Sequence, residues 1–217
     1  MYNLHCHSLL SDGVLLPSEI AVRYLSIGYK AIAITDHADY SNIDTVAEAI
    51  LCFTGHWPKD SNIRIFPGVE LTHIPPEQFK PLVKRARAKG LKVIIGHGET
   101  LTEPVIKGTN RAALEAGVDI LAHPGLITQE DAALAAKKGI FLEITCRKGH
   151  RDTNAHVVDM GIRSSAKLII NADSHSPEDI INPQEAEKFA LAAGLSETDI
   201  KKIYKDVTLF LSGKGAR

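Results

Sequence analysis

The first residues that could do chemistry are two histidines separated by a single position. His5 and His7 lie in the stretch HCHSLLSDG, and Asp12 follows the second histidine by five residues. In a β-strand, residues two apart point to the same face, so the two imidazoles could bind one metal ion. A histidine pair of this kind also occurs in strands that bind nothing. The pair alone leaves a metal site and a structural role as alternatives.

Further histidines and carboxylates follow short apolar runs along the chain. They are His37, Glu70, His97, His123, Asp173 and His175. Asp173 and His175 repeat the two-residue spacing, and a carboxylate such as Glu70 could bridge two ions. Imidazole and carboxylate ligands suit Zn²⁺, Mn²⁺ or Fe²⁺, whereas Mg²⁺ favours fewer histidines. So many residues of this type in equivalent positions favour a metal site over a set of structural histidines.

The elements that position these residues are expected to be buried parallel strands. Seven near-continuous apolar runs predict them, because parallel strands are covered on both faces. The runs are 2–7, 30–37, 63–71, 91–97, 118–124, 139–146 and 167–175. Nearly all of the candidate ligands stand at the carboxyl end of one of these runs.

Amphipathic segments of helical period separate the strands. They are 16–29, 42–53, 76–90, 108–117, 128–139, 153–163, 183–194 and 196–212. Strands that alternate with helices predict one α/β domain over residues 1–217, most simply a closed parallel barrel, with a loose tail over 210–217. An open doubly wound sheet is the alternative. It would normally show a glycine-rich phosphate loop after the first strand, and SLLSDG matches that pattern poorly.

A closed barrel would bring residues that are distant in sequence together. In such barrels the carboxyl ends of the strands meet on one rim, where active sites are built. The candidate ligands would therefore form a single cluster. The strand that ends with Glu143, Thr145 and Arg147 would bring these side chains to the same rim.

Composition limits the partners that we expect. The formal net charge is -1, so no general positive field attracts nucleic acid, and few aromatic residues are available to stack on bases. Three cysteines without CxxC spacing do not form a disulfide framework or a zinc finger. The sequence contains neither a long apolar stretch nor a signal peptide. We expect a cytoplasmic protein without membrane partners.

At this point the sequence resembles the PHP (polymerase and histidinol phosphatase) domain family over essentially its whole length. The motifs that carry the resemblance are HCHSLLSDG, ITDHAD (34–39), PGVEL (67–71), GHGE (96–99), AHPG (122–125), LEIT (142–145) and NADSH (171–175). The resemblance implies a distorted seven-stranded (β/α)7 TIM-like barrel that holds two or three divalent metal ions.

The resemblance also implies a ligand set for each ion. The first ion would take His5, His7, Glu70 and Asp173; the second Asp12, His37 and His175; the third Glu70, His97 and His123. Some members of the family have a histidine where this chain has Asp12, and either residue can ligate. Since no ligand position is missing, the resemblance implies a catalytic member of the family.

The activity that the resemblance implies is metal-dependent hydrolysis of a phosphoester. The ions would activate a water and neutralise the phosphate charge, with Asp12, His37 and His175 as catalytic residues. Arg147 is the predicted phosphate clamp, and Lys148 and His150 are weaker candidates for substrate contacts. We expect a phosphomonoesterase acting on a small phosphorylated metabolite such as histidinol phosphate. A nuclease or nucleotide phosphatase of the same fold, and a metal-binding regulatory module without turnover, are the alternatives.

Other residues near the candidate ligands receive structural interpretations. Asp36 is expected to orient a ligand histidine. Cys6 should point away from the metals because its two neighbours point toward them, and Cys146 is also expected to be structural. His56 and His73 lie outside the pattern and are interpreted as surface residues that could shape a pocket.

Overall fold

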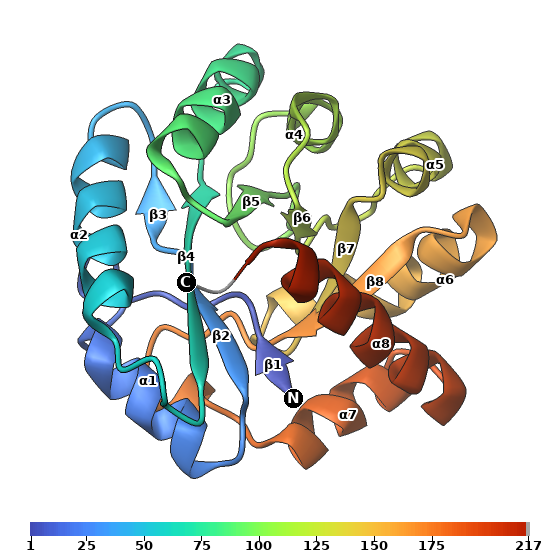
Figure 1. The fold of residues 1–217 in the computed structure, drawn as a ribbon. Helices are drawn as coiled ribbons and strands as arrows, with labels where there is room; N and C mark the ends of the chain where they lie inside the picture. The colour runs from blue at the N-terminus through green and yellow to red at the C-terminus, as the bar shows by residue number, and fades with distance from the viewer. Residues whose placement is uncertain (216–217) are drawn as a thin grey trace.

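The computed structural model describes residues 1–215, in which a twisted parallel sheet is surrounded by helices (Figure 1). The strands are β1 (Tyr2–Asn3), β2 (Ala31–Ile34), β3 (His37–Ala38), β4 (Arg64–Leu71), β5 (Val93–His97), β6 (Ile120–Ala122), β7 (Phe141–Thr145) and β8 (Lys167–Asn171). Their spatial order is β1-β2-β4-β5-β6-β7-β8, and the short strand β3 pairs with β4. Neighbours in the sheet follow the order of the chain, as they do in a (β/α) barrel.

The first and last strands meet and nearly close the sheet. Just beyond the two strands, Cys6 and Ser174 form a parallel bridge, and the His7 N–H donates to the Ser174 carbonyl over 2.9 Å. Two buried asparagines complete the seam. The Leu4 N–H donates to Asn171 Oδ1 (2.9 Å), and the Ala172 N–H donates to Asn3 Oδ1 (2.7 Å). The expected distorted (β/α)7 TIM-like barrel is confirmed, and the open doubly wound alternative is wrong.

Helices cover the outside of the sheet in every interval where the sequence predicts one (Figure 1). They are α1 (Pro17–Ser26), α2 (Ile43–His56), α3 (Phe79–Lys89), α4 (Thr109–Ala116), α5 (Gln129–Lys138), α6 (Asn154–Ser164), α7 (Pro183–Ala192) and α8 (Glu197–Gly213), with three short 3₁₀ turns at Pro76–Gln78, His150–Thr153 and Pro177–Asp179. The Thr128 hydroxyl caps α5 by accepting from the Asp131 N–H, as its sequence predicts. Within residues 1–215, none of these helices is both long and apolar enough to cross a membrane.

Every observed strand is shorter than its apolar run, and the first two are interrupted for identifiable reasons. The first ends at Asn3 because the backbone beyond it bonds to asparagine side chains, which leaves His5 and His7 in an irregular segment. The second breaks at Thr35 and Asp36 and resumes as β3. There the Thr35 N–H donates across the sheet to the Cys6 carbonyl. Both interruptions occur where the chain enters the rim that carries the candidate ligands.

Helix α8 closes the opposite, amino-terminal end of the barrel. Tyr204 packs edge-on against Tyr2 at the start of β1, and Phe210 does the same against Phe141 at the start of β7. Lys214 forms an ion pair of 2.6 Å with the largely buried Asp119. Residues 210–214 are therefore packed rather than a loose tail, and residues 216–217 of the predicted tail lie outside the described residues.

The seam between the first and last strands generates a stability prediction at Tyr24. Its hydroxyl is fully buried, accepts from Asn3 Nδ2 (3.0 Å) and lies 2.9 Å from Ser174 Oγ. Tyr24→Phe removes one hydrogen-bond partner from each of these buried groups, and we expect it to lower the free energy of unfolding by about 1–3 kcal/mol. Urea denaturation measures the change. Tyr40→Phe is the matched control, because this ring is 47% exposed. Equal stability of the two variants would contradict the role of the seam.

Candidate metal centre

Four side chains from three different parts of the barrel lie close together, and His5, His7 and Glu70 bring one atom each within reach of a single ion. His5 Nε2 lies 3.3 Å from Glu70 Oε2 and 3.5 Å from Asp173 Oδ1. His7 Nε2 lies 3.5 Å and 3.3 Å from the same two oxygens. All four side chains are buried. These are the residues that the family resemblance implies for the first ion.

The atoms that this group offers as ligands fit a divalent cation. The Nε2 atoms of His5 and His7 and both carboxylate oxygens of Glu70 are buried without a well-aligned hydrogen bond among the described residues, although His37 Nδ1 lies 2.9 Å from Glu70 Oε2. Unpartnered buried polar atoms are costly, and a cation bound between them removes the cost. Ligand atoms of an ion at about 2.1 Å lie about 3.4 Å apart in tetrahedral geometry, and the four histidine–carboxylate separations of 3.3–3.5 Å are close to this value.

Glu143, at the centre of β7, orients two of the candidate ligands. Its Oε1 lies 2.8 Å from His5 Nδ1, so His5 presents Nε2 to the cluster, and Asn171 Nδ2 donates to the same oxygen over 2.8 Å. Its Oε2 accepts from the His123 N–H (3.1 Å). A carboxylate behind a ligating histidine sets the tautomer and direction of the ring. The sequence placed Glu143 on the rim but did not predict this role.

Asp36 does not orient a histidine, contrary to the sequence-based prediction. Its carboxylate accepts from the Ser8 N–H (2.7 Å), the Ser8 hydroxyl (2.8 Å) and the Ser11 hydroxyl (2.7 Å). It therefore holds the loop that follows His7. The reason is the break after β2, which turns Asp36 toward this loop and leaves His37 to face the cluster.

The second predicted group is also assembled, at the more open side of the cluster. Asp12 Oδ1 lies 3.4 Å from His37 Nε2, and Asp12 Oδ2 lies 3.4 Å from His175 Nε2. The His7 ring packs against those of His37 and His175, with centroids 4.1 Å and 4.0 Å away. Gly13 lets the loop place Asp12 here, because a Cβ at this position would stand 2.2 Å from the His7 carbonyl oxygen. The four residues can offer atoms to one ion.

The third predicted group is Glu70, His97 and His123, whose ligand atoms also lie close enough to share an ion. His123 Nε2 is 3.6 Å from Glu70 Oε1. Glu70 thus presents one oxygen to the first group and the other to the third, as a bridging carboxylate would. All nine predicted metal ligands therefore stand in one continuous cluster. Their roles as ligands stay predictions.

Backbone strain is concentrated at this cluster. Among the described residues, the non-glycine residues with positive φ are His73 (51°), His123 (26°), Ser165 (55°) and Asp173 (52°). Three of these four follow strands at the rim. Such conformations cost about 1–3 kcal/mol each and persist where the surroundings determine them, which is common at functional sites. The strain turns His123 and Asp173 toward the interior of the rim.

Some of the buried groups are already in the states that ligate a cation. Burial and the neighbouring His37 lower the pKa of His7 to about 3, so the ring is neutral near pH 7. Burial alone would raise the pKa of Glu70, but His5 and His37 hold it well below its usual range. The same balance, with His5 as the main partner, lowers the pKa of Asp173. Both carboxylates are therefore ionised.

His5 and His37 are not yet in the state that ligates a cation. Burial alone would lower their pKa values, but the neighbouring carboxylates, chiefly Glu143 for His5 and Glu70 for His37, raise them. Both rings would therefore lose a proton on binding a cation.

Arg147 lies beside the second group of candidate ligands. Its Nη1 donates to the Asp173 carbonyl (3.1 Å) and contacts the His175 ring. Lys148 is exposed. His150 is buried behind the cluster, with its ring 4.4 Å from that of His123 and its Nδ1 2.6 Å from Thr100 Oγ1. Of the three predicted substrate contacts, Arg147 therefore lies at the rim beside the candidate ligands. Lys148 lies in solvent, and His150 is packed behind the cluster.

Glu103, on the loop between β5 and α4, is the residue of the site that the sequence analysis missed. Its carboxylate contacts His73, His97 and His150. The available signal was a carboxylate in a loop that follows a ligand-bearing strand. His73 is accordingly part of the site, whereas His56 lies exposed at the end of α2 as expected.

The buried cysteines behave as the sequence predicts. Cys6 points away from the cluster and donates through Sγ to the Ala33 carbonyl (3.1 Å). Burial raises the pKa of the Cys146 thiol to about 12, so this thiol is not a nucleophile near pH 7.

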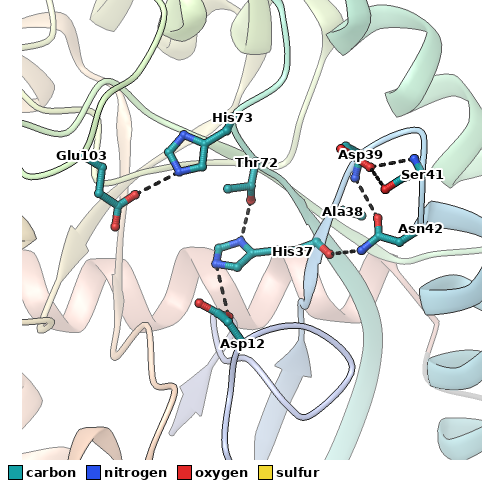
Figure 2. A pocket seen from close by; sticks show the side chains of 9 residues that line it. All are labelled: Asp12, His37, Ala38, Asp39, Ser41, Asn42, Thr72, His73 and Glu103. Carbon is teal, nitrogen blue, oxygen red and sulfur yellow. Dashed lines mark hydrogen bonds and ion pairs between the residues drawn. The ribbon is translucent and has the colours of Figure 1, made fainter.

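A cavity of about 350 Å³ opens beside the cluster (Figure 2). Its walls are Asp12, His37, Ala38, Asp39, Ser41, Asn42, Thr72, His73 and Glu103. Figure 2 shows Asp12 and His37 on one side and the His73–Glu103 pair on the other. The candidate ligands therefore border a space that a small molecule can enter.

Fold and side-chain cluster together define a class of protein, the (β/α) barrels with a divalent metal centre at the carboxyl ends of the strands. The model of the PHP domain matches residues 3–154. The chain belongs to the PHP domain family. Family membership and the ligand cluster support a metal-dependent phosphoesterase.

Three known proteins illustrate the similarity. The uncharacterized protein MJ1295 of Methanocaldococcus jannaschii is 41% identical over 202 residues, 92% of this chain and 93% of that protein. Ribonuclease P protein component 3 of Methanosarcina barkeri is 26% identical over 89% of this chain and 81% of its own. The fold also matches histidinol phosphate phosphatase of Lactococcus lactis, solved with zinc, L-histidinol and phosphate, with a TM-score of 0.63, 18% identity, and coverage of 90% of this chain and 94% of that chain.

The position of Glu143 generates a prediction about metal affinity. Glu143→Gln removes the charge and exchanges one acceptor for a donor, so that either His5 or the His123 backbone loses its partner. We expect the affinity for Zn²⁺ to fall about 10–100-fold. Competition with a chromophoric chelator measures it. The exposed Glu115→Gln is the control, and an unchanged affinity in Glu143→Gln would show that His5 is held by other contacts.

Proposed function

We propose that the protein is a phosphomonoesterase that hydrolyses a small phosphorylated metabolite, with histidinol phosphate as the first compound to test. The observation that carries the proposal is that His5, His7 and Glu70 hold buried potential ligand atoms without well-aligned hydrogen bonds, beside an open cavity. Two or three divalent ions, Zn²⁺, Mn²⁺ or Fe²⁺, suit these ligands. When bound, such ions lower the pKa of water and neutralise charge on a phosphate.

The residues of the chain would supply the remaining functions. Asp12, His37 and His175 form the more exposed group of ligands, so the reacting phosphate would lie on their side of the cluster. Arg147 would bind phosphate oxygens from beside His175, because a guanidinium forms paired hydrogen bonds with such groups. The cavity of about 350 Å³ suits a metabolite. Lys148, which is exposed, is a weaker contact.

A nuclease is the second candidate function. The observation that favours it is the similarity to ribonuclease P protein component 3 over 89% of the chain. The net charge of -1 and the acidic side chains on the cavity wall weigh against binding of an extended polyanion. A short oligonucleotide could still reach the rim.

Turnover distinguishes these functions. Protein loaded with Zn²⁺, Mn²⁺ or Fe²⁺ is incubated with a panel of phosphomonoesters and with short oligonucleotides. We expect phosphate release from monoesters, its loss after treatment with EDTA, and its loss in His175→Ala. Nucleotide release alone would favour the nuclease. No release at full metal occupancy would favour a regulatory module without turnover, and wild-type activity of His175→Ala would contradict the site.

Arg147 generates a separate kinetic prediction. Hydrogen bonds to a charged group contribute about 1.5–3 kcal/mol, which corresponds to a KM about 10–100-fold higher in Arg147→Ala. Steady-state kinetics on the best monoester measure KM and kcat, and elemental analysis checks that the metal content is unchanged. Arg163→Ala is the control, since Arg163 is exposed on α6. Unchanged KM and kcat would remove Arg147 from the phosphate site.

A further inference from the structure

Glu103 is surrounded by imidazoles in a way that the predicted ligand set does not explain. It reaches the rim from the loop between β5 and α4 and contacts three histidines from three different segments. None of the three ligand groups that the family resemblance implies includes this carboxylate. Figure 2 shows it at the wall of the cavity, directed toward His73.

The two oxygens of Glu103 have different surroundings. Oε1 lies 3.4 Å from His150 Nε2, and His150 is itself anchored through Nδ1 to Thr100 Oγ1 at 2.6 Å. Oε2 lies 3.0 Å from His97 Nε2 and 3.3 Å from His73 Nε2. His150 thus holds the carboxylate so that its second oxygen faces two imidazole nitrogens. This is how a supporting residue orients a ligating carboxylate.

The partners of the His97 ring favour a cation at this point. Its Nδ1 lies 3.1 Å from the Gly98 carbonyl, which can only accept a hydrogen bond. A neutral ring that donates there presents a lone pair at Nε2, opposite the lone pairs of Glu103 Oε2. A bound cation would hold two such acceptors at this separation. Atoms that ligate one ion at about 2.1 Å lie about 3.0–3.4 Å apart, for octahedral and tetrahedral geometry respectively.

His73 approaches the same oxygen from the end of β4. It is held at a φ of 51°, and its ring centroid lies 4.6 Å from that of His97. His73, His97 and Glu103 can each offer one atom within the reach of a single ion. A strained, 45% exposed histidine directed at a carboxylate is consistent with a ligand.

We propose that Glu103 is a ligand of the ion bound to His97 and, with His73, completes the coordination of this ion from the solvent side. The inference rests on the metal dependence of the proposed function. It adds ligands to the third group, whose other members, Glu70 and His123, approach from the interior. The ion at His97 is then held by one buried and one solvent-facing carboxylate.

The test compares metal binding, not turnover. Wild type, Glu103→Gln and His73→Gln are dialysed against buffers of fixed free Zn²⁺, and the zinc content is measured by elemental analysis. Removal of a ligand should weaken one site by at least as much as loss of a supporting residue, about 10–100-fold. We expect Glu103→Gln to lose one equivalent of zinc at a free concentration that saturates wild type, and His73→Gln to weaken the same site.

Two controls make the result specific. Glu178→Gln removes a carboxylate from an exposed position on the loop after β8 and should keep the wild-type content. With Co²⁺ in place of Zn²⁺, the visible absorption bands of Glu103→Gln should change, since they report ligand identity directly. Circular dichroism in EDTA checks that the variants fold alike.

The opposite results are equally clear. The same zinc content, affinity and Co²⁺ spectrum in wild type and Glu103→Gln would overturn the inference and leave Glu103 as a hydrogen-bond partner of these histidines. The proposed function would survive that result. If wild type itself binds no Zn²⁺, Mn²⁺ or Fe²⁺, the inference and the proposed function both fail.

Discussion

The structure depends on the closure of the parallel sheet between its first and last strands. His5 and His7 follow β1, and Asp173 and His175 follow β8, about 170 residues later in the chain. Their ligand atoms come within 3.3–3.5 Å because the Cys6–Ser174 bridge and the Asn3 and Asn171 side chains join these strands. An open sheet of the same strands would leave the two halves of the cluster on opposite edges.

The asparagine seam has a second consequence. Side-chain amides replace part of the backbone ladder, so the chain leaves regular strand geometry before His5 and can aim its histidines inward. Asn171 also donates to Glu143, which lies against His5 and binds the His123 backbone. Barrel closure and ligand orientation thus share one hydrogen-bonded network. A change at the seam should therefore affect metal affinity as well as stability.

Burial of so many ionisable groups is tolerated because they face one another. Glu70 is fully buried yet stays ionised, since its usual rise in pKa on burial is outweighed by the surrounding imidazoles. In the loaded protein, divalent cations would supply that positive charge. The cluster extends outward from this core through His97 to Glu103, and the cavity begins where exposure increases. Ligands buried on one side and a cavity on the other suit hydrolysis of a small substrate.

Much of this protein follows from the sequence alone. Apolar runs that alternate with amphipathic segments predict a parallel sheet covered by helices, and strand ends predict which histidines and carboxylates share an edge of that sheet, because side-chain chemistry and periodicity are local properties. The roles of Asp36 and Glu143 could not be read in this way, since each depends on the direction in which a strand breaks and on the groups that then lie opposite. Glu103, His73 and His150 meet only because loops from different strands fold over the same rim. Those contacts, and the separations that make the cluster fit an ion, are decided by tertiary structure, because they depend on closing the sheet and not on spacing along the chain.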